Sequence, residues 1–186
     1  MSNCKIAFIG GGNMARSLIG GLGATGISSQ NISVSEPRAD LRKKLNGDFG
    51  VNALDENSSA VMGADVVVLA VKPQILREVL IPLGNLIAET RPLLISVAAG
   101  VTSSSIERWV GGHPALIRVM PNTPALIGAG ISALYANSNV SDDQRALAEK
   151  IMAAVGKTVW IKEETLMDAV TAVSGSGPAY FFYVMQ

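Results

Sequence analysis

A glycine cluster near the N-terminus constrains this chain more than any other feature. Residues 10–15 read Gly-Gly-Gly-Asn-Met-Ala, a G-x-G-x-x-A pattern that separates an apolar run at 5–9 from a segment at 14–22 with apolar residues at helical spacing. In such a strand–loop–helix unit the first glycine permits a tight turn, the second lets a pyrophosphate approach the backbone, and the small third residue lets helix and strand pack closely. The N-terminus of the helix attracts the diphosphate. We therefore expect a dinucleotide to bind at Gly10, Gly11, Gly12, Asn13 and Met14.

The rest of the chain continues this alternation of strands and helices. The strongest predicted strand, 65–71, contains the run Val-Val-Val-Leu without polar alternation, which is typical of strands buried on both faces of a parallel sheet. Further strands are predicted at 32–35, 93–97, 116–120, 131–135 and 158–161, and helices at 38–45, 74–87, 102–110 and 142–155. This order predicts a doubly wound α/β fold with a mainly parallel sheet and helices on both faces.

A second, helical unit is expected after the sheet. The Lys-Glu-Glu run at 162–164 opens a predicted helix that continues through residue 173, and the strand pattern stops there. We expect a dinucleotide-binding domain at 1–162 and the beginning of a helical domain at 163–186.

Composition excludes several classes of protein. The 15 basic and 15 acidic residues give a formal net charge of zero, so we expect no nucleic-acid partner. The single cysteine and the single histidine, Cys4 and His113, supply neither an internal disulfide nor the usual zinc site, and we expect no metal. Apolar runs are too short or too polar for a signal peptide or a membrane span, so we expect a cytoplasmic protein without membrane partners.

The end of the second predicted strand carries two side chains that influence coenzyme choice. Glu36 stands about 20 positions after the glycine cluster, where a carboxylate accepts hydrogen bonds from the ribose hydroxyls of NAD and repels the 2′-phosphate of NADP. Arg38 favours the opposite choice, because its guanidinium pairs with a phosphate. The alternative is that both residues belong to a solvated loop. The sequence leaves NADPH and NADH open as cofactors, and we expect mixed use.

Later strand ends supply further candidates, because ligands of open α/β sheets lie at the carboxyl ends of the strands. Val71 and Lys72 are expected to line the cofactor cleft, Ala99 is small enough for the nicotinamide half to pass over the backbone, and Asn122 offers an amide. Each position also has a purely structural explanation. Lys72 is then a surface lysine, small residues near Ala99 serve helix packing, and the Asn-Thr-Pro turn needs no ligand.

A Ser-Gly-Ser-Gly-Pro-Ala segment at 174–179 lies between two stretches of helical composition. Pro178 suits a first helical position, with Ser176 or Gly177 as the cap. This arrangement predicts an exposed helix N-terminus suited to a carboxylate or carboxamide. The alternative is a glycine-jointed corner between two helices.

Five segments together resemble the pyrroline-5-carboxylate reductase family. They are Phe8–Met14, Ala70–Pro73, Ser96–Val101, Met120–Pro124 and Asp168–Tyr180. The resemblance implies a Rossmann domain followed by an all-helical domain that forms a homodimer or a larger ring. It also implies hydride transfer from NADPH or NADH to C5 of the cyclic imine 1-pyrroline-5-carboxylate, which gives L-proline in the last step of proline biosynthesis.

The resemblance also assigns residues. It places cofactor contacts on Gly10 to Met14, Glu36, Asn57, Val71, Lys72 and Ala99. Glu164 matches the acidic residue beside the substrate, and with Asn122 and Ser176 it completes our substrate candidates.

The resemblance also places the family's main substrate loop after residue 186. We accordingly expect a chain cut short, whose uncharged end at 180–185 is exposed or covered by a neighbouring chain. Such a chain is expected to bind the dinucleotide but to turn over substrate poorly or not at all.

No catalytic residue is assigned, because no Ser/His/Asp or Cys/His set and no paired carboxylates are present at a suitable spacing. The cofactor then carries the chemistry. One alternative is a β-hydroxyacid dehydrogenase, but that class uses a lysine on its interdomain helix and residues 165–186 contain none. The other is a dinucleotide-binding module without activity.

Overall fold

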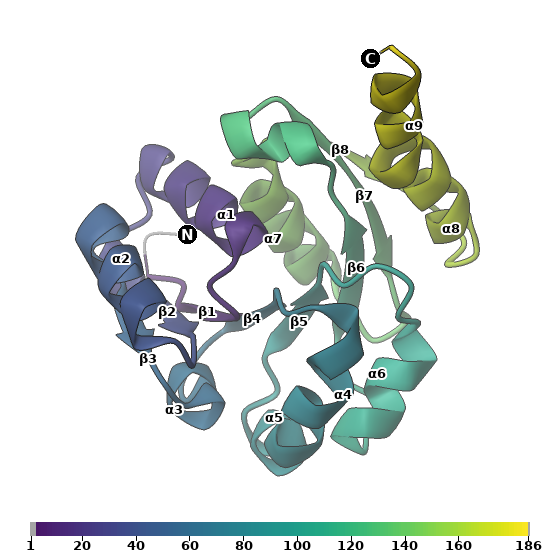
Figure 1. Ribbon diagram of the computed structural model, residues 1–186. Coiled ribbons are helices and arrows are strands. Elements are labelled where there is room, and N and C mark those ends of the chain that lie inside the picture. The colour runs from purple at the N-terminus through teal and green to yellow at the C-terminus, as the bar shows by residue number, and fades with distance from the viewer. Residues whose placement is uncertain (1–2, 186) are drawn as a thin grey trace.

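Eight strands form one sheet in the order β3-β2-β1-β4-β5-β6-β7-β8 (Figure 1). The structure is a computed structural model that describes residues 3–185. All neighbouring strands pair in parallel except β6 and β7, which are antiparallel. The strands are β1 (Ile6–Ile9), β2 (Ile32–Ser35), β3 (Asn52–Leu54), β4 (Val66–Leu69), β5 (Leu93–Ser96), β6 (Leu116–Met120), β7 (Gly130–Ala136) and β8 (Gly156–Trp160). The mainly parallel sheet predicted from the sequence is confirmed.

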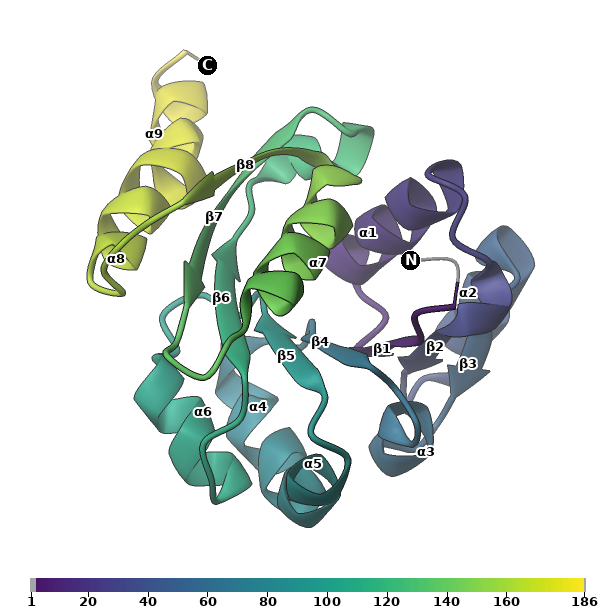
Figure 2. The same ribbon diagram turned by 180° about the vertical axis from the view of Figure 1, so that it is seen from behind.

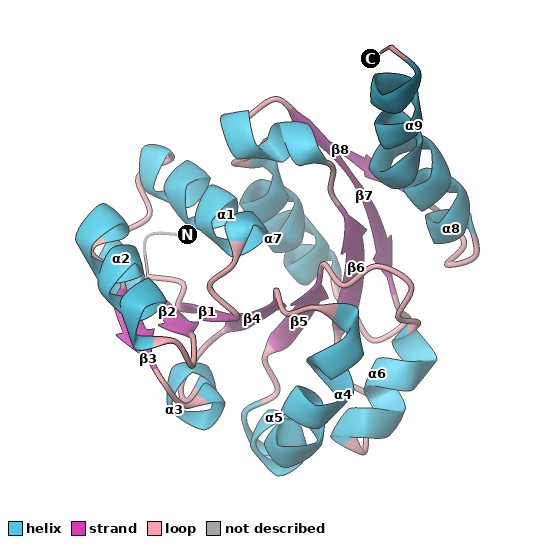
Figure 3. Cartoon of the chain, in the orientation of Figure 1, coloured by secondary structure: helices cyan, strands magenta, loops and turns pink. Residues whose placement is uncertain are grey.

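Helices cover both faces of the sheet, joined to the strands by short loops (Figure 3). The helices are α1 (Asn13–Ala24), α2 (Ala39–Phe49), α3 (Asn57–Val61), α4 (Pro73–Leu80), α5 (Gly84–Thr90), α6 (Ser103–Val110), α7 (Asp142–Ala153), α8 (Leu166–Val170) and α9 (Gly177–Val184).

Two apolar cores hold these layers together. Alternate residues of β1 enter different cores: Ile6 and Phe8 join the core under α1, α2 and α7, whereas Ala7 and Ile9 join the core under α3 to α6. The inner strands β1, β4 and β5 are buried at every position, which explains their continuous apolar runs in the sequence. Figures 1 and 2 show the two helical layers on opposite sides of the sheet.

β3 and α3 were not predicted from the sequence. β3 has three residues at the sheet edge, and α3 has five. Such short elements contain too few residues to show a period. β3 is instead formed by its pairing with β2.

The helix expected at 74–87 is interrupted. α4 ends at Leu80, a 3₁₀ turn (Ile81–Leu83) follows, and α5 begins at Gly84. Pro82 lies inside this turn, and because proline has no backbone N–H it cannot continue an α-helical ladder.

The segment after the sheet also differs from expectation. Residues 162–165 are a bend and a turn, so the helix begins at Leu166 rather than at 162–164. A π-helical turn (Thr171–Ser176) then joins α8 to α9, and Ser176 has helical backbone angles. The expected helix N-terminus at Ser176 is therefore wrong, and so is the glycine-jointed corner. α8 contacts β7, and Figure 2 shows α9 continuing from α8.

Candidate functional site

The glycine loop brings three strand ends together. The N–H of Gly10 donates a hydrogen bond to the carbonyl oxygen of Ser35, 2.9 Å away at the end of β2. A Cβ atom at Gly10 would lie 2.8 Å from the carbonyl oxygen of Ala70 and 2.9 Å from Val71 Cγ1, and the φ angle of Gly10 is +99°. A side chain at this position is excluded twice, by space and by backbone conformation.

The N-terminus of α1 is open. Gly12 precedes the helix, no side chain within residues 3–185 caps it, and the first turn contains no acidic residue. A Cβ atom at Gly12 would meet nothing within 4 Å. The first N–H groups of α1 therefore point into free space with a partial positive charge, which suits a diphosphate. A dinucleotide fits this loop.

Glu36 is buried beside the same loop, with 8% of its surface exposed. One carboxylate oxygen accepts a hydrogen bond from the N–H of Gly11 and the other from the N–H of Arg38, each at 3.1 Å. Glu36 is therefore not part of a solvated loop. Arg38 is exposed instead, and its guanidinium pairs with Asp40 at 2.8 Å.

The remaining coenzyme candidates follow neighbouring strands. Asn57 begins α3, and its side-chain oxygen contacts the hydroxyl of Ser35. Val71 packs against Gly10, whereas Lys72 is exposed immediately before α4. Glu36, Asn57 and Val71 thus follow the carboxyl ends of β2, β3 and β4, on the side of the sheet where the glycine loop follows β1.

A groove of about 370 Å³ lies beside the start of α1. Its lining includes Asn13 and Met14 from α1, Ala99 after β5, Asn122 after β6, and Gly175 from the π-helical turn. The Asn122 side-chain oxygen accepts a hydrogen bond from the N–H of Ile131 at 2.9 Å, which fixes the loop. Three coenzyme candidates and one substrate candidate, which are far apart in the sequence, therefore line the same groove.

Glu164 and Ser176 do not line this groove. Ser176 is exposed in the π-helical turn next to Gly175. Glu164 lies before α8, and its Oε1 accepts hydrogen bonds from the N–H of Ser103 at 2.6 Å and from Arg118 Nη1 at 2.7 Å.

Arg118 is a residue that sequence reasoning missed. Its side chain is 8% exposed, whereas the Glu164 side chain is 26% exposed. A signal was available in the sequence, since Arg118 is the one charged residue of the apolar strand β6. A buried arginine requires an anionic partner, so this residue predicts a nearby carboxylate.

The same contacts set the ionisation of Glu164. Burial raises the pKa of its carboxyl group, but hydrogen bonds from the Ser103 N–H and from Arg118 outweigh burial and lower the pKa below the usual value of 4.5. Glu164 is therefore an anion at neutral pH that joins the segment before α8 to the first turn of α6.

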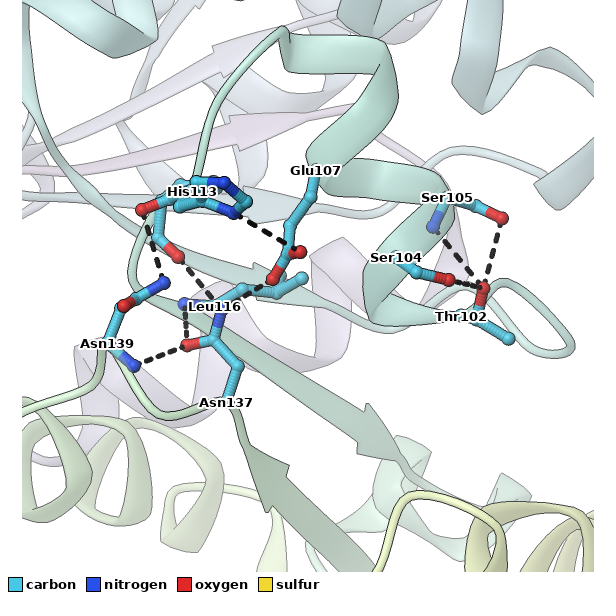
Figure 4. A network of polar contacts seen from close by, with 9 residues as sticks. Thr102, Ser104, Ser105, Glu107, His113, Leu116, Asn137 and Asn139 are labelled. Atoms are coloured by element: carbon cyan, nitrogen blue, oxygen red, sulfur yellow. Dashed lines mark hydrogen bonds and ion pairs between the residues drawn. The ribbon is translucent and has the colours of Figure 1, made fainter.

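Helix α6 is fixed near both ends (Figure 4). At its start the Thr102 side chain accepts a hydrogen bond from the N–H of Ser105 at 3.3 Å. Toward its end Glu107 accepts a hydrogen bond from the Asn137 side chain at 2.9 Å, and Asn137 also bonds the N–H of Leu116 at 3.2 Å. Helix α6, whose first turn binds the Glu164 carboxylate, is thus connected to β6 and to the end of β7.

Comparison with known proteins identifies the family. Residues 5–100 match the family described as NADP oxidoreductase coenzyme F420-dependent, and residues 164–186 match the family described as pyrroline-5-carboxylate reductase dimerisation. The chain is 49% identical, over all of its 186 residues and 68% of the relative, to the pyrroline-5-carboxylate reductase of Pseudomonas aeruginosa. The chain belongs to the pyrroline-5-carboxylate reductase family.

Solved structures of the pyrroline-5-carboxylate reductase family agree with the fold. A member from Coxiella burnetii superposes with a TM-score of 0.94 at 43% identity, over 98% of this chain and 68% of that one. A Plasmodium falciparum enzyme, solved with NADP bound, superposes with a TM-score of 0.86 at 31% identity, over 99% of this chain and 67% of that one. The resemblance drawn from the sequence is confirmed, and it is favoured over the β-hydroxyacid dehydrogenase alternative.

Two features are absent from residues 3–185. No helix in this part of the chain is long and apolar enough to cross a membrane. The same residues contain no group of three or more His, Cys, Asp or Glu side chains placed to hold a metal ion.

The pKa of Glu164 predicts a pH-dependent stability. A carboxyl group whose pKa is lowered by folding stabilises the folded state above its unfolded pKa, and this contribution is lost as the pH falls through the folded pKa. We expect Glu164→Gln to lower the free energy of unfolding by about 1–3 kcal/mol at pH 7, with the difference from wild type shrinking below about pH 4.5. Urea unfolding at a series of pH values measures this difference.

Glu163→Gln is the matched control, because it removes an equal charge from the exposed neighbouring residue. A Glu164→Gln difference that stays constant from pH 7 to pH 3.5, or that equals the control, contradicts the contact described here.

Proposed function

We propose that this protein reduces 1-pyrroline-5-carboxylate to L-proline with NADPH or NADH as the hydride donor. The observation that carries the proposal is the groove that brings the glycine loop together with Ala99 and Asn122, in a chain 49% identical to a pyrroline-5-carboxylate reductase. When bound, the coenzyme supplies a hydride from the nicotinamide ring.

The residues of this chain bind and orient the reactants. The N–H groups at the start of α1 bind the diphosphate, and Glu36 accepts hydrogen bonds from the adenosine ribose. Asn57, Val71 and Lys72 line the coenzyme on the side of β2 and β4. Ala99 leaves room for the nicotinamide over the loop after β5. These assignments use the strand-end geometry and are part of the proposal.

The substrate side is formed by Asn122, Ser176 and Glu164. Asn122 lies in the groove, and Ser176 follows Gly175, which lines it. Glu164 lies before α8, and its carboxylate binds the first turn of α6, which follows the loop that carries Ala99. A protonated cyclic imine already carries the positive charge that accepts a hydride, so orientation and electrostatics supply the rate without a dedicated acid.

We further propose that the protein acts in the cytoplasm as a homodimer or a larger ring. The aromatic side chains of α9, Tyr180, Phe181, Phe182 and Tyr183, are exposed in this chain, as expected from the sequence. An exposed apolar helix of this kind suits a contact with a second copy. Residues 164–186 also match the dimerisation family named above.

Proline formation tests the proposed reaction. The chain aligns with 68% of the P. aeruginosa relative, so the assay uses the 186-residue chain and a chimera that continues it into the remaining part of that relative. We expect both to bind NADPH, and we expect the chimera to form one L-proline for each NADPH oxidised, only when the imine is present. The chain alone is expected to form proline slowly or not at all.

The C-terminal part of the relative without this chain is the control and is expected to be inactive. A chimera that folds and binds NADPH but forms no proline contradicts the proposed reaction.

Glu36 and Arg38 are expected to oppose each other in coenzyme choice. Wild-type affinities for NADH and NADPH should lie within about tenfold, or ~1.4 kcal/mol. Glu36→Gln removes a negative charge beside the ribose and should shift the ratio toward NADPH by about tenfold, whereas Arg38→Gln should shift it toward NADH. Fluorescence titrations with both coenzymes measure the ratio. A thousandfold preference in the wild type, or an unchanged ratio in Glu36→Gln, contradicts this prediction.

A further inference from the structure

A groove between α4 and α6 contains two arginine side chains. Its volume is about 440 Å³, and its lining is Arg77 and Ile81 on one side and Ser105, Arg108 and Trp109 on the other. Figures 1 and 2 both show α4 and α6 side by side on one face of the sheet. None of the described residues that line the groove is acidic. The groove is distinct from the coenzyme and substrate groove, with which it shares no lining residue.

The two arginines lack protein partners. Neither Arg77 nor Arg108 forms an ion pair or a side-chain hydrogen bond with any residue between 3 and 185. Three other arginines of the chain are paired with carboxylates: Arg16 with Asp48, Arg38 with Asp40, and Arg118 with Glu164.

Helix dipoles explain only part of this arrangement. Arg77 and Arg108 each lie in the last turn of their helix, where the dipole favours a cation. That effect accounts for each arginine separately. It does not account for two cations without an acidic neighbour at one groove, an arrangement that a bound anion would stabilise.

The side chains around the groove match a phosphate group. A guanidinium presents its N–H donors in a planar fork that fits phosphate oxygens in a bidentate manner. The half-buried indole of Trp109 offers a flat apolar surface beside the two cations. The hydroxyl of Ser105 lies 3.0 Å from that of Thr102, which orients it at the edge of the groove. We propose that this groove binds the phosphate group of a small phosphorylated molecule between Arg77 and Arg108.

The position of the groove indicates how a bound phosphate would affect the proposed coenzyme site. α4 begins directly after Lys72, and α6 begins shortly after the loop that carries Ala99. A phosphate held by both helices therefore fixes the spacing of two loops that line the coenzyme in the proposed function. This consequence rests on the proposed function, whereas phosphate binding itself does not.

Intrinsic fluorescence of the protein without coenzyme tests the site. The chain has two tryptophans, so a Trp160→Phe background leaves Trp109 as the reporter. We expect a saturable change in emission on titration with inorganic phosphate at constant ionic strength, and none with sodium chloride. Phenyl phosphate, whose ring can stack on Trp109, should bind more tightly than inorganic phosphate. Equal binding of the two would identify free phosphate as the occupant of the same site.

Three variants decide the outcome. Arg77→Gln and Arg108→Gln should each weaken phosphate binding at least tenfold, whereas Arg91→Gln, which changes an exposed arginine outside the groove, should leave it unchanged. Without phosphate, the first two variants should differ little from wild type in stability, because the lost helix-dipole interaction offsets the relief of mutual repulsion. Absence of a saturable response, or phosphate binding in the groove variants equal to that of wild type, overturns the proposal.

Discussion

The close approach of Gly10 to the end of β4 is the constraint on which the proposed coenzyme site depends. Its backbone passes so near the Ala70 carbonyl oxygen that a Cβ atom would lie 2.8 Å from it, and its N–H bonds Ser35 at the end of β2. Parallel pairing places the carboxyl ends of β1, β2 and β4 at one edge of the sheet. Gly10 therefore sets where α1 begins, and Glu36, Val71 and the N-terminus of α1 surround the same loop.

The sequence predicts those elements whose signal lies in neighbouring residues. The glycine motif marked the β1–α1 turn, and the continuous valine run of β4 marked a strand buried on both faces. The strand-end rule selected Ala99 and Asn122, and in the structure both line one groove with Asn13 of the glycine motif. β3 was missed because three edge residues carry no periodic signal, and their structure comes from pairing with β2.

One error near the end of the chain has a local cause, and the other depends on long-range contacts. The Ser-Gly-Ser-Gly-Pro segment favours a break by its residue types, yet the helix continues as a π-turn. In this turn the N–H of Gly177 reaches the carbonyl oxygen of Ala172 immediately before Pro178, which has no N–H to donate. The partners of Glu164 could not be predicted from local patterns, because Ser103 and Arg118 are 61 and 46 positions away in sequence. The fold alone brings them together.

The affinity of NADPH for a Gly12→Asp variant tests most directly whether the dinucleotide lies on this loop. Gly12 has the extended backbone of a helix cap and open space around it, so an aspartate should cap α1 and leave the free energy of unfolding unchanged or higher. Its carboxylate would take the N–H groups and the space of the diphosphate. The predicted result is a loss of affinity on the order of a hundredfold, or ~2.7 kcal/mol. Unchanged NADPH affinity in a stably folded Gly12→Asp protein would contradict the placement of the coenzyme on the glycine loop.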